Sequence, residues 1–421
     1  MYTLAGHITD PKLRANGRNS LIDGMWYCVM VGLTQPFVGV YAIKLGASDY
    51  LVGLLSSLPA LVALFSQVPG AIICDRYASR LLVTRRYALL HRLFYLVIAF
   101  LPLLAPPGWR AVAFVFMVAA MNFPGTVAGV AWTALMGDLF PAHVRGRVFG
   151  ERNTLTGFVT LICTLAGGVL LDRSERWFPW NYSAAYLVSF GALLLSYYYL
   201  GKLQEDPRRL GQTPDRPGVL RALRSFSQVI QNRPFVRFTL PIFVFHLGLN
   251  LPAAIYSILF VRILSLPAVW IGAFSVIFGL TGVLTYSWWG RLADRIGNRT
   301  VLNITLWLWP IFPILYAFVG GPWPIALLMA VGGVVGSGFN LTVFNSLLEV
   351  APEDGRPNYV AVFNLANGLT GFAMPMLGVV IYRTWGLLAV MALATGVRLL
   401  GALFSRQARR NAFGDSTVGL V

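Results

Sequence analysis

The chain reads Gly290-Arg-Leu-Ala-Asp294-Arg295-Ile-Gly297-Asn-Arg299 between two long apolar runs. This basic segment is short, and the sequence on either side of it is hydrophobic. Of the 421 residues, 57% are hydrophobic and 12% are charged. This fraction of charged side chains is too small to solvate a globule of this size. We therefore expect a polytopic membrane protein in which such basic segments are loops between spans.

The first half of the chain contains a fainter copy of this loop. The copy reads Asp75-Arg76-Tyr-Ala-Ser-Arg80, and at one constant offset its Asp and Arg residues align with those of the second loop. A second motif is also duplicated, as Asp138-x-x-Pro141-x-x-x-Arg145 and Glu349-x-x-Pro352-x-x-x-Arg356. The chain is therefore predicted to consist of two similar halves.

Twelve apolar runs are long enough to cross a bilayer as helices. They cover residues 20–43, 50–74, 87–105, 111–136, 153–171, 183–200, 238–260, 268–289, 301–319, 323–348, 361–381 and 385–404. Each half has an even number of runs, so both halves insert with the same orientation, as a parallel repeat. The predicted domains are a six-helix bundle at 1–200, a cytoplasmic linker at 201–237 and a second six-helix bundle at 238–421.

The net charge of +17 reflects membrane topology and does not indicate nucleic-acid binding, because Lys and Arg are spread among short loops. Most of them lie on the side that holds both termini and the linker. The other side has only Lys44, Arg110, Arg173, Arg176, Arg262 and Arg383. We therefore expect a multi-pass protein of the cell membrane with both termini in the cytoplasm.

The linker is the one long polar segment. Its second part, residues 219–233, has Val219, Leu223, Phe226 and Ile230 on one helical face. Two alternatives remain: this amphipathic helix lies along the inner membrane surface, or it packs on the protein's own cytoplasmic face.

The pattern of the two loops, G-x-x-x-D-R-x-G-R-R, resembles the major facilitator superfamily of secondary transporters. Gly290, Asp294, Arg295, Gly297 and Arg299 match it. The departures are Asn298 in the second copy and Ala71, Ala78 and Ser79 in the first. The resemblance implies an all-α fold of 12 transmembrane helices in two parallel six-helix bundles, which move a small solute by alternating access.

Charged residues near one membrane face form a predicted cytoplasmic gate, like the charge network of facilitators. The set is Asp75, Arg76, Arg80, Asp138, Arg145, Asp294, Arg295, Arg299, Glu349 and Arg356. Ion pairs that are half out of water are each worth on the order of 1 kcal/mol, which suits a latch that opens by thermal motion. The alternative is that these charges only anchor loops and set topology.

The resemblance also implies that spans 1, 4, 7 and 10 line a central cavity. The candidate substrate residues on these spans are Gln35, Tyr41, Asn122, Phe123, Trp132, His246, Asn250, Tyr256, Asn340, Phe344 and Asn345. Amides in hydrocarbon must face another helix or water, although Asn can also merely join helices. Amides with aromatic rings suit a neutral or amphipathic solute.

Few titratable groups fall inside the runs. Asp23 is the leading candidate for proton coupling, with pairing to Arg92 or Arg18 as the alternative. His246 is the second candidate, with a satisfied core histidine as the alternative.

We expect a secondary transporter, and proton-coupled export of a small organic solute is the first hypothesis. Uptake of a sugar-like solute and a transport-inactive sensor or assembly factor are the alternatives. An enzyme is not expected, because the four histidines are scattered and no paired acids appear. Cys28, Cys74 and Cys163 lie in apolar runs and indicate neither a disulfide framework nor a zinc site. We expect no cofactor, no metal and no nucleic-acid partner, and a monomer in the bilayer.

Overall fold

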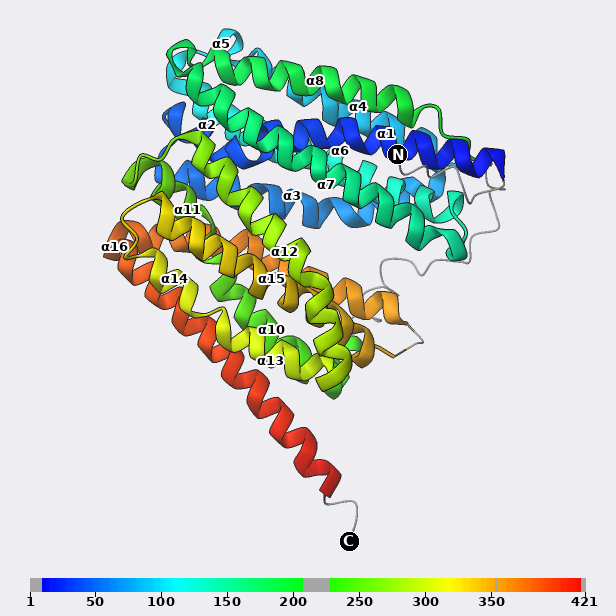
Figure 1. The fold of residues 1–421 in the computed structure, drawn as a ribbon, viewed down its shortest axis with the longest axis vertical. Helices are drawn as coiled ribbons and strands as arrows, with labels where there is room; N and C mark the ends of the chain where they lie inside the picture. Colours follow the sequence, from blue (N-terminus) through cyan, green and yellow to red (C-terminus); the bar gives the residue numbers. More distant parts are fainter. Residues whose placement is uncertain (1–9, 207–227, 353–354, 418–421) are drawn as a thin grey trace. The chain divides into compact units, whose positions relative to one another are not determined.

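The computed structural model describes residues 10–206, 228–352 and 355–417, and it contains helices and turns but no strand in these ranges. The chain divides into two compact units (Figure 1). Unit 1 comprises Met1–Pro214 and Ser265–Ala273, and unit 2 comprises Asp215–Leu264 and Phe274–Val421. The short stretch Ser265–Ala273 thus belongs to unit 1 although it follows the linker in sequence.

Unit 1 is built from six long helices and several short ones. They are α1 (Pro11–Thr34), η1 (Gln35–Phe37), α2 (Val38–Lys44), α3 (Asp49–Arg76), α4 (Arg80–Ala99), α5 (Leu101–Leu104), η2 (Pro107–Trp109), α6 (Arg110–Leu139), α7 (Ala142–Arg173), η3 (Glu175–Trp177) and α8 (Trp180–Leu200). Helix α1 packs against α7 and α8, and α6 packs against α3 and α4. Helix α4 also packs against α8, so α8 contacts both α1 and α4.

Unit 2 repeats this plan. Its helices are α10 (Arg233–Asn250), α11 (Ala253–Ile258), η4 (Leu259–Ile263), α12 (Ala268–Ile296), α13 (Asn298–Leu308), α14 (Ile311–Tyr316), α15 (Pro322–Val350) and α16 (Arg356–Thr417). Helix α10 packs along α16, and α13 packs against α15 and α16. Because α10 and α13 occupy the places in the second half that α1 and α4 occupy in the first, the predicted repeat is matched by the packing.

Each of the twelve predicted runs coincides largely with one helix or with two or three consecutive helical elements. Nine helices in the described ranges are long and apolar enough to cross a membrane. The count is lower than twelve partly because α16 contains two runs: Gly386 has φ +83° and interrupts the helical backbone between them. Two other runs are also missing from the count. Residues 301–319 are divided between the short helices α13 and α14, and residues 87–105 lie mostly in α4, which has charged residues at its start.

Two predicted runs are broken where proline occurs within them. In the first run α1 ends at Thr34 and a 3-10 turn that contains Pro36 follows. In the seventh run α10 ends at Asn250 and α11 starts after Pro252. Proline lacks the backbone N–H and clashes with the preceding turn, so both helices bend at matching places.

Two helices begin earlier than the apolar pattern predicts. Helix α1 starts at Pro11, where Asp10 Oδ1 accepts a hydrogen bond from the Lys12 amide at 2.9 Å. Helix α10 starts at Arg233, five residues before the predicted second bundle, because Asn232 Oδ1 accepts from the Phe235 amide at 3.1 Å. Such caps satisfy amides that have no partner within the helix. Most of the predicted linker helix lies outside the described residues.

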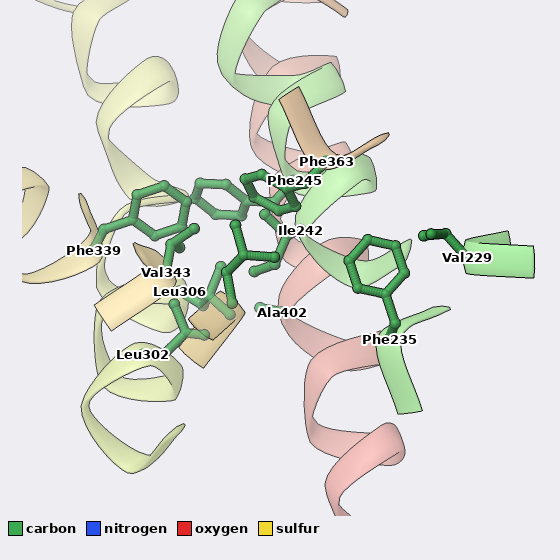
Figure 2. Close-up of a cluster of buried hydrophobic side chains, with 11 residues drawn as sticks. Val229, Phe235, Ile242, Phe245, Leu302, Leu306, Phe339, Val343, Phe363 and Ala402 are labelled. Carbon is green, nitrogen blue, oxygen red and sulfur yellow. The ribbon is translucent and has the colours of Figure 1, made fainter. Parts of the chain in front are cut away.

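The largest described hydrophobic cluster lies in unit 2, where α10, α13, α15 and α16 meet. Figure 2 shows Phe245 and Ile242 of α10 facing Phe339 of α15, with Leu306 of α13 beside them. Phe245 and Phe339 have ring centroids 5.1 Å apart. These large side chains hold four helices at fixed distances, and such well-packed rings contribute beyond their buried area.

Close backbone approach also fixes helices of unit 2. A Cβ at Gly378 of α16 would overlap with the carbonyl oxygen of Leu251, directly after α10. Glycine at this position therefore allows the two segments to touch at backbone distance, as small residues do between membrane helices.

Asp172, near the end of α7, holds Ser265–Ala273 within unit 1. Its Oδ1 and Oδ2 accept hydrogen bonds from the amides of Ala268 and Val269, each at 2.8 Å. These are amides at the start of α12 that lack partners within the helix. The carboxylate therefore caps α12 from another helix.

Candidate functional site

A buried polar chain joins three helices of unit 1. Arg92 of α4 donates through Nη2 to Oγ of Ser196 on α8 at 2.8 Å, and this hydroxyl donates to Oδ1 of Asp23 on α1 at 2.6 Å. Asp23 is 5% exposed and Arg92 is 4% exposed. The serine bridges the two ions, because a hydroxyl can accept one hydrogen bond and donate another.

Arg152 of α7 provides a second guanidinium group near Asp23. Its Nε donates to the Ser20 carbonyl at 3.2 Å, and its Cζ lies 4.7 Å from the centre of the Trp132 ring. Arg152 also acts electrostatically on the Asp23 carboxylate. A Cβ on Gly24 would lie 2.7 Å from Arg152 Nη2, so the glycine leaves room for the guanidinium to cross α1.

These side chains line a pocket of about 340 Å³ inside unit 1. The polar part of its wall is Asp23, Arg92 and Arg152, and Trp132 lies at their edge. The remainder is mostly apolar, with Tyr27, Cys28, Thr84, Ala88, Ala128, Gly129 and Leu200. Pockets of this size with a few convergent polar groups are typical of small-molecule sites. The pocket therefore combines one acid, two fixed positive charges and an apolar wall.

Unit 2 has a buried arginine at the corresponding meeting of helices, but its surroundings differ. Arg398 of α16 is 2% exposed. Its Nε donates to the Gly248 carbonyl at 3.0 Å, its Nη1 donates to the Trp309 carbonyl at 3.4 Å, and it bonds to the Tyr256 side chain. Backbone carbonyls and a phenol satisfy this guanidinium, which indicates a structural role.

The predicted cavity residues of unit 1 fall in different environments. Trp132 lines the pocket together with Asp23. Tyr41 is 0% exposed and stacks on Tyr182 with ring centroids 4.6 Å apart, which fits packing better than binding. Asn122 donates to the Val118 carbonyl of its own helix at 2.7 Å. Gln35 and Phe123 are exposed.

In unit 2 most of the predicted cavity residues have partners within the unit. His246 bonds through Nδ1 to the Ile242 carbonyl at 2.8 Å. Asn250 donates to Thr370 Oγ1 at 2.9 Å, and Tyr256 bonds to Arg398 as above. Asn345 donates to Asn298 at 3.1 Å, in the loop motif at residues 290–299. This hydrogen bond joins α15 to the start of α13. Asn340 and Phe344 are exposed.

The gate charges of unit 1 are partly paired. Arg80 Nη1 and Asp138 Oδ2 form an ion pair of 2.7 Å. Glu205 caps α4, because its carboxylate accepts from the amides of Arg80 and Leu81 at 2.8 and 3.0 Å. Arg145 donates to the carbonyls of Gly137 and Phe140 at 2.8 and 3.1 Å, so it binds the end of α6. Asp75 and Arg76 sit at the end of α3.

The gate charges of unit 2 differ from those of unit 1. Glu349, the counterpart of Asp138, accepts a hydrogen bond from Asn298 Nδ2 at 2.6 Å. Asn298, which departs from the motif, is thus the partner of Glu349, whereas Arg80 is the partner of Asp138 in unit 1. Asp294, Arg295 and Arg299 are exposed, and Arg356 is half-buried.

The sequence predicts Arg92 only as an alternative partner of Asp23. It does not single out Arg152, which lines the pocket, or Ser196, which bridges Arg92 and Asp23. The available signal was an arginine in an apolar run, since charges there are rare and mark functional sites. The same signal also selects Arg398, so sequence alone does not separate the two arginines.

Comparison with known proteins agrees with this architecture. The family model described as Major Facilitator Superfamily matches residues 24–286 and 242–413. Multidrug resistance protein MdtG of Salmonella typhimurium is 24% identical over 90% of this chain and 92% of its own length. Among solved structures, a mutant of the nucleoside transporter NupG superposes with a TM-score of 0.73 at 14% identity, covering 93% of this chain and 99% of that one.

A bacterial homolog of the human lysosomal transporter Spinster superposes with a TM-score of 0.65 at 14% identity, covering 97% of this chain and 99% of that one. These structural similarities show the fold, and the match to the family model extends over both units. The chain belongs to the major facilitator superfamily, as a multi-pass membrane protein with this superfamily's fold.

Proposed function

We propose that the protein is a secondary transporter of the cell membrane that exports a small neutral or amphipathic organic solute in exchange for protons. The proposed organisation is two six-helix bundles, at 1–200 and 238–421, joined by a cytoplasmic linker and with both termini in the cytoplasm. The bundles alternate in opening a binding site to the two sides of the membrane.

One observation carries the coupling part of this proposal. Asp23 is the only buried carboxylate in the described ranges, and it lines a pocket inside unit 1. A carboxyl group within the membrane is costly and marks proton relays. The hydroxyl of Ser196 gives Asp23 one hydrogen bond, and the group still faces the pocket, where it can exchange a proton.

The names of the relatives support the proposed direction of transport. Proteins named multidrug resistance protein MdtG align with 90% of the chain, and an exporter of several compounds needs an adaptable apolar site. The aromatic and amide side chains at Trp132, Asn250 and Tyr256 suit such solutes. We include these residues in the proposed solute path, together with the other predicted cavity positions except Tyr41, which packs against Tyr182.

The gate charges remain part of the proposal. The Arg80–Asp138 pair and the Asn298–Glu349 bond each link the start of a helix to the end of another within one unit. Each interaction is partly exposed and therefore weak, so either can be exchanged during a transport cycle.

Transport in everted membrane vesicles tests the function. We expect vesicles with an acidic interior to accumulate an amphipathic dye, and the dye to dissipate the pH gradient, only when the protein is present. Counterflow of labelled sugar without dye transport would favour the alternative of sugar-like uptake. No flux of either probe, in vesicles that contain correctly folded protein, would contradict transport and favour a sensor.

A further inference from the structure

The pocket of unit 1 has more positive than negative charge. Arg92 and Arg152 face one acid, Asp23, in its wall. The charged and titratable groups around Asp23 are Arg92 of α4, Arg152 of α7, and Tyr27 and Cys28 of its own helix. Tyr197 of α8 lies beneath Arg92, 5.3 Å from its Cζ to the ring centre. No second carboxylate among the described lining residues balances the second guanidinium.

Arg92 uses only part of its hydrogen-bonding capacity. Its Nη2 binds Ser196, but its Nε and Nη1 are buried and have no partner among the described residues. A buried charged donor without a partner is costly. Arg398, which is equally buried, has carbonyl partners for its Nε and Nη1. Arg92, which lines the pocket, thus has donors that no group among the described residues satisfies.

The rest of the wall defines what kind of ligand fits. The Cζ atom of Arg152 lies 4.7 Å from the centre of the Trp132 ring, and this contact fixes the guanidinium at one side of the pocket. Ala88, Ala128 and Leu200 form apolar surface. Guanidinium groups bind carboxylate and phosphate oxygens through paired N–H donors. The pocket therefore suits an oxyanion attached to an apolar group.

We propose that this pocket binds the anionic group of an amphipathic molecule, a carboxylate or a phosphate, between Arg92 and Arg152. The apolar part of the molecule lies against Ala88, Ala128 and Leu200. This is a statement about binding to unit 1, and it does not depend on the direction of transport.

Protonation of Asp23 strengthens this binding. The ionised carboxylate neutralises one guanidinium and repels a second anion, whereas the protonated group does neither. Anion affinity therefore rises as pH falls through the titration of Asp23. Protonation of Asp23 and binding of the anion therefore favour each other. In proton-coupled exchange, by contrast, the proton and the exported solute must compete for the site. The bound anion is for this reason distinct from the exported solute.

Calorimetric titration of the full chain in phosphatidylcholine nanodiscs tests the proposal, with benzoate as the probe and benzamide as its neutral match. We expect benzoate to bind at least about tenfold more tightly than benzamide at mildly acidic pH. Arg92→Lys and Arg152→Gln should each weaken benzoate about tenfold or more and leave benzamide unchanged. Arg86→Gln, an exposed arginine of the same helix α4, is the control and should have no effect.

Asp23→Asn gives a readout that a structural role would not produce. At mildly alkaline pH this variant should bind benzoate about tenfold more tightly than the unmodified chain, and its affinity should no longer depend on pH. Nanodiscs with phosphatidylglycerol distinguish two sources of the anion. In the unmodified chain, weaker benzoate binding with phosphatidylglycerol than with phosphatidylcholine, and no such difference in Arg152→Gln, identifies a lipid headgroup as occupant. Equal binding in the two lipids identifies a free anion.

Two results would overturn the proposal. One is equal affinity for benzoate and benzamide in the unmodified chain. The other is that Arg92→Lys and Arg152→Gln, both folded, bind benzoate as well as Arg86→Gln does.

Discussion

Replacing Ser196 with alanine tests the buried chain from which the site is built. The hydroxyl of Ser196 makes two hydrogen bonds to charged partners, at 2.8 Å to Arg92 and at 2.6 Å to Asp23. Its side chain is 0% exposed, so water does not replace these bonds in the variant. Hydrogen bonds to charged groups contribute about 1.5–3 kcal/mol each. Taking the lower value for both, Ser196→Ala should reduce the free energy of unfolding by about 3 kcal/mol.

Ser189→Ala is the matched control on the same helix. Ser189 is also 0% exposed, but its hydroxyl has no hydrogen-bond partner among the described residues. The same atoms are removed from the same kind of environment, so Ser189→Ala should change the free energy of unfolding by no more than about 0.5 kcal/mol. Unfolding by sodium dodecyl sulfate in mixed micelles measures both variants. Equal stability of the two would refute the claim that Ser196 holds Asp23 and Arg92 together.

Two further predictions concern helix packing and the gate. Gly378→Ala should destabilise unit 2 by about 3 kcal/mol or more, because its Cβ would overlap with the Leu251 carbonyl. Gly396 faces open space in the same helix, so Gly396→Ala should have little effect in the same unfolding assay. Asp294→Asn should slow solute flux in vesicles while the amount of inserted protein stays the same, and full activity would contradict the latch.

The fold could be predicted from sequence because it depends on patterns that are local or repeated. Apolar runs of bilayer length locate the helices, and the loop at Asp294 with its copy at Asp75 shows the duplication. The bends near Pro36 and Pro252 follow from proline chemistry, although the runs themselves appear continuous. The interruption at Gly386 lies close to the predicted break between the last two runs, where Arg383 separates them.

The site could be predicted only in part, because its partners are distant in sequence. Asp23 stands out as an acid in an apolar run. Its partner Ser196 is 173 residues away, and serine is common in membrane helices, so nothing marks this one. Tyr41 shows the opposite limit: its place on the first span predicted a cavity residue, but its ring stacks on Tyr182 in an aromatic cluster. Whether a polar side chain faces a pocket depends on helix rotation, which one sequence does not determine.

The central claim is that Asp23 couples protons to solute movement. The most direct test compares Asp23→Asn with the unmodified chain in proteoliposomes, using Asp206→Asn, an exposed acid paired with Lys12, as the control. Asp23→Asn should keep solute exchange at equal pH but lose accumulation driven by a pH gradient, while the control keeps both. Undiminished gradient-driven accumulation by Asp23→Asn would contradict the claim.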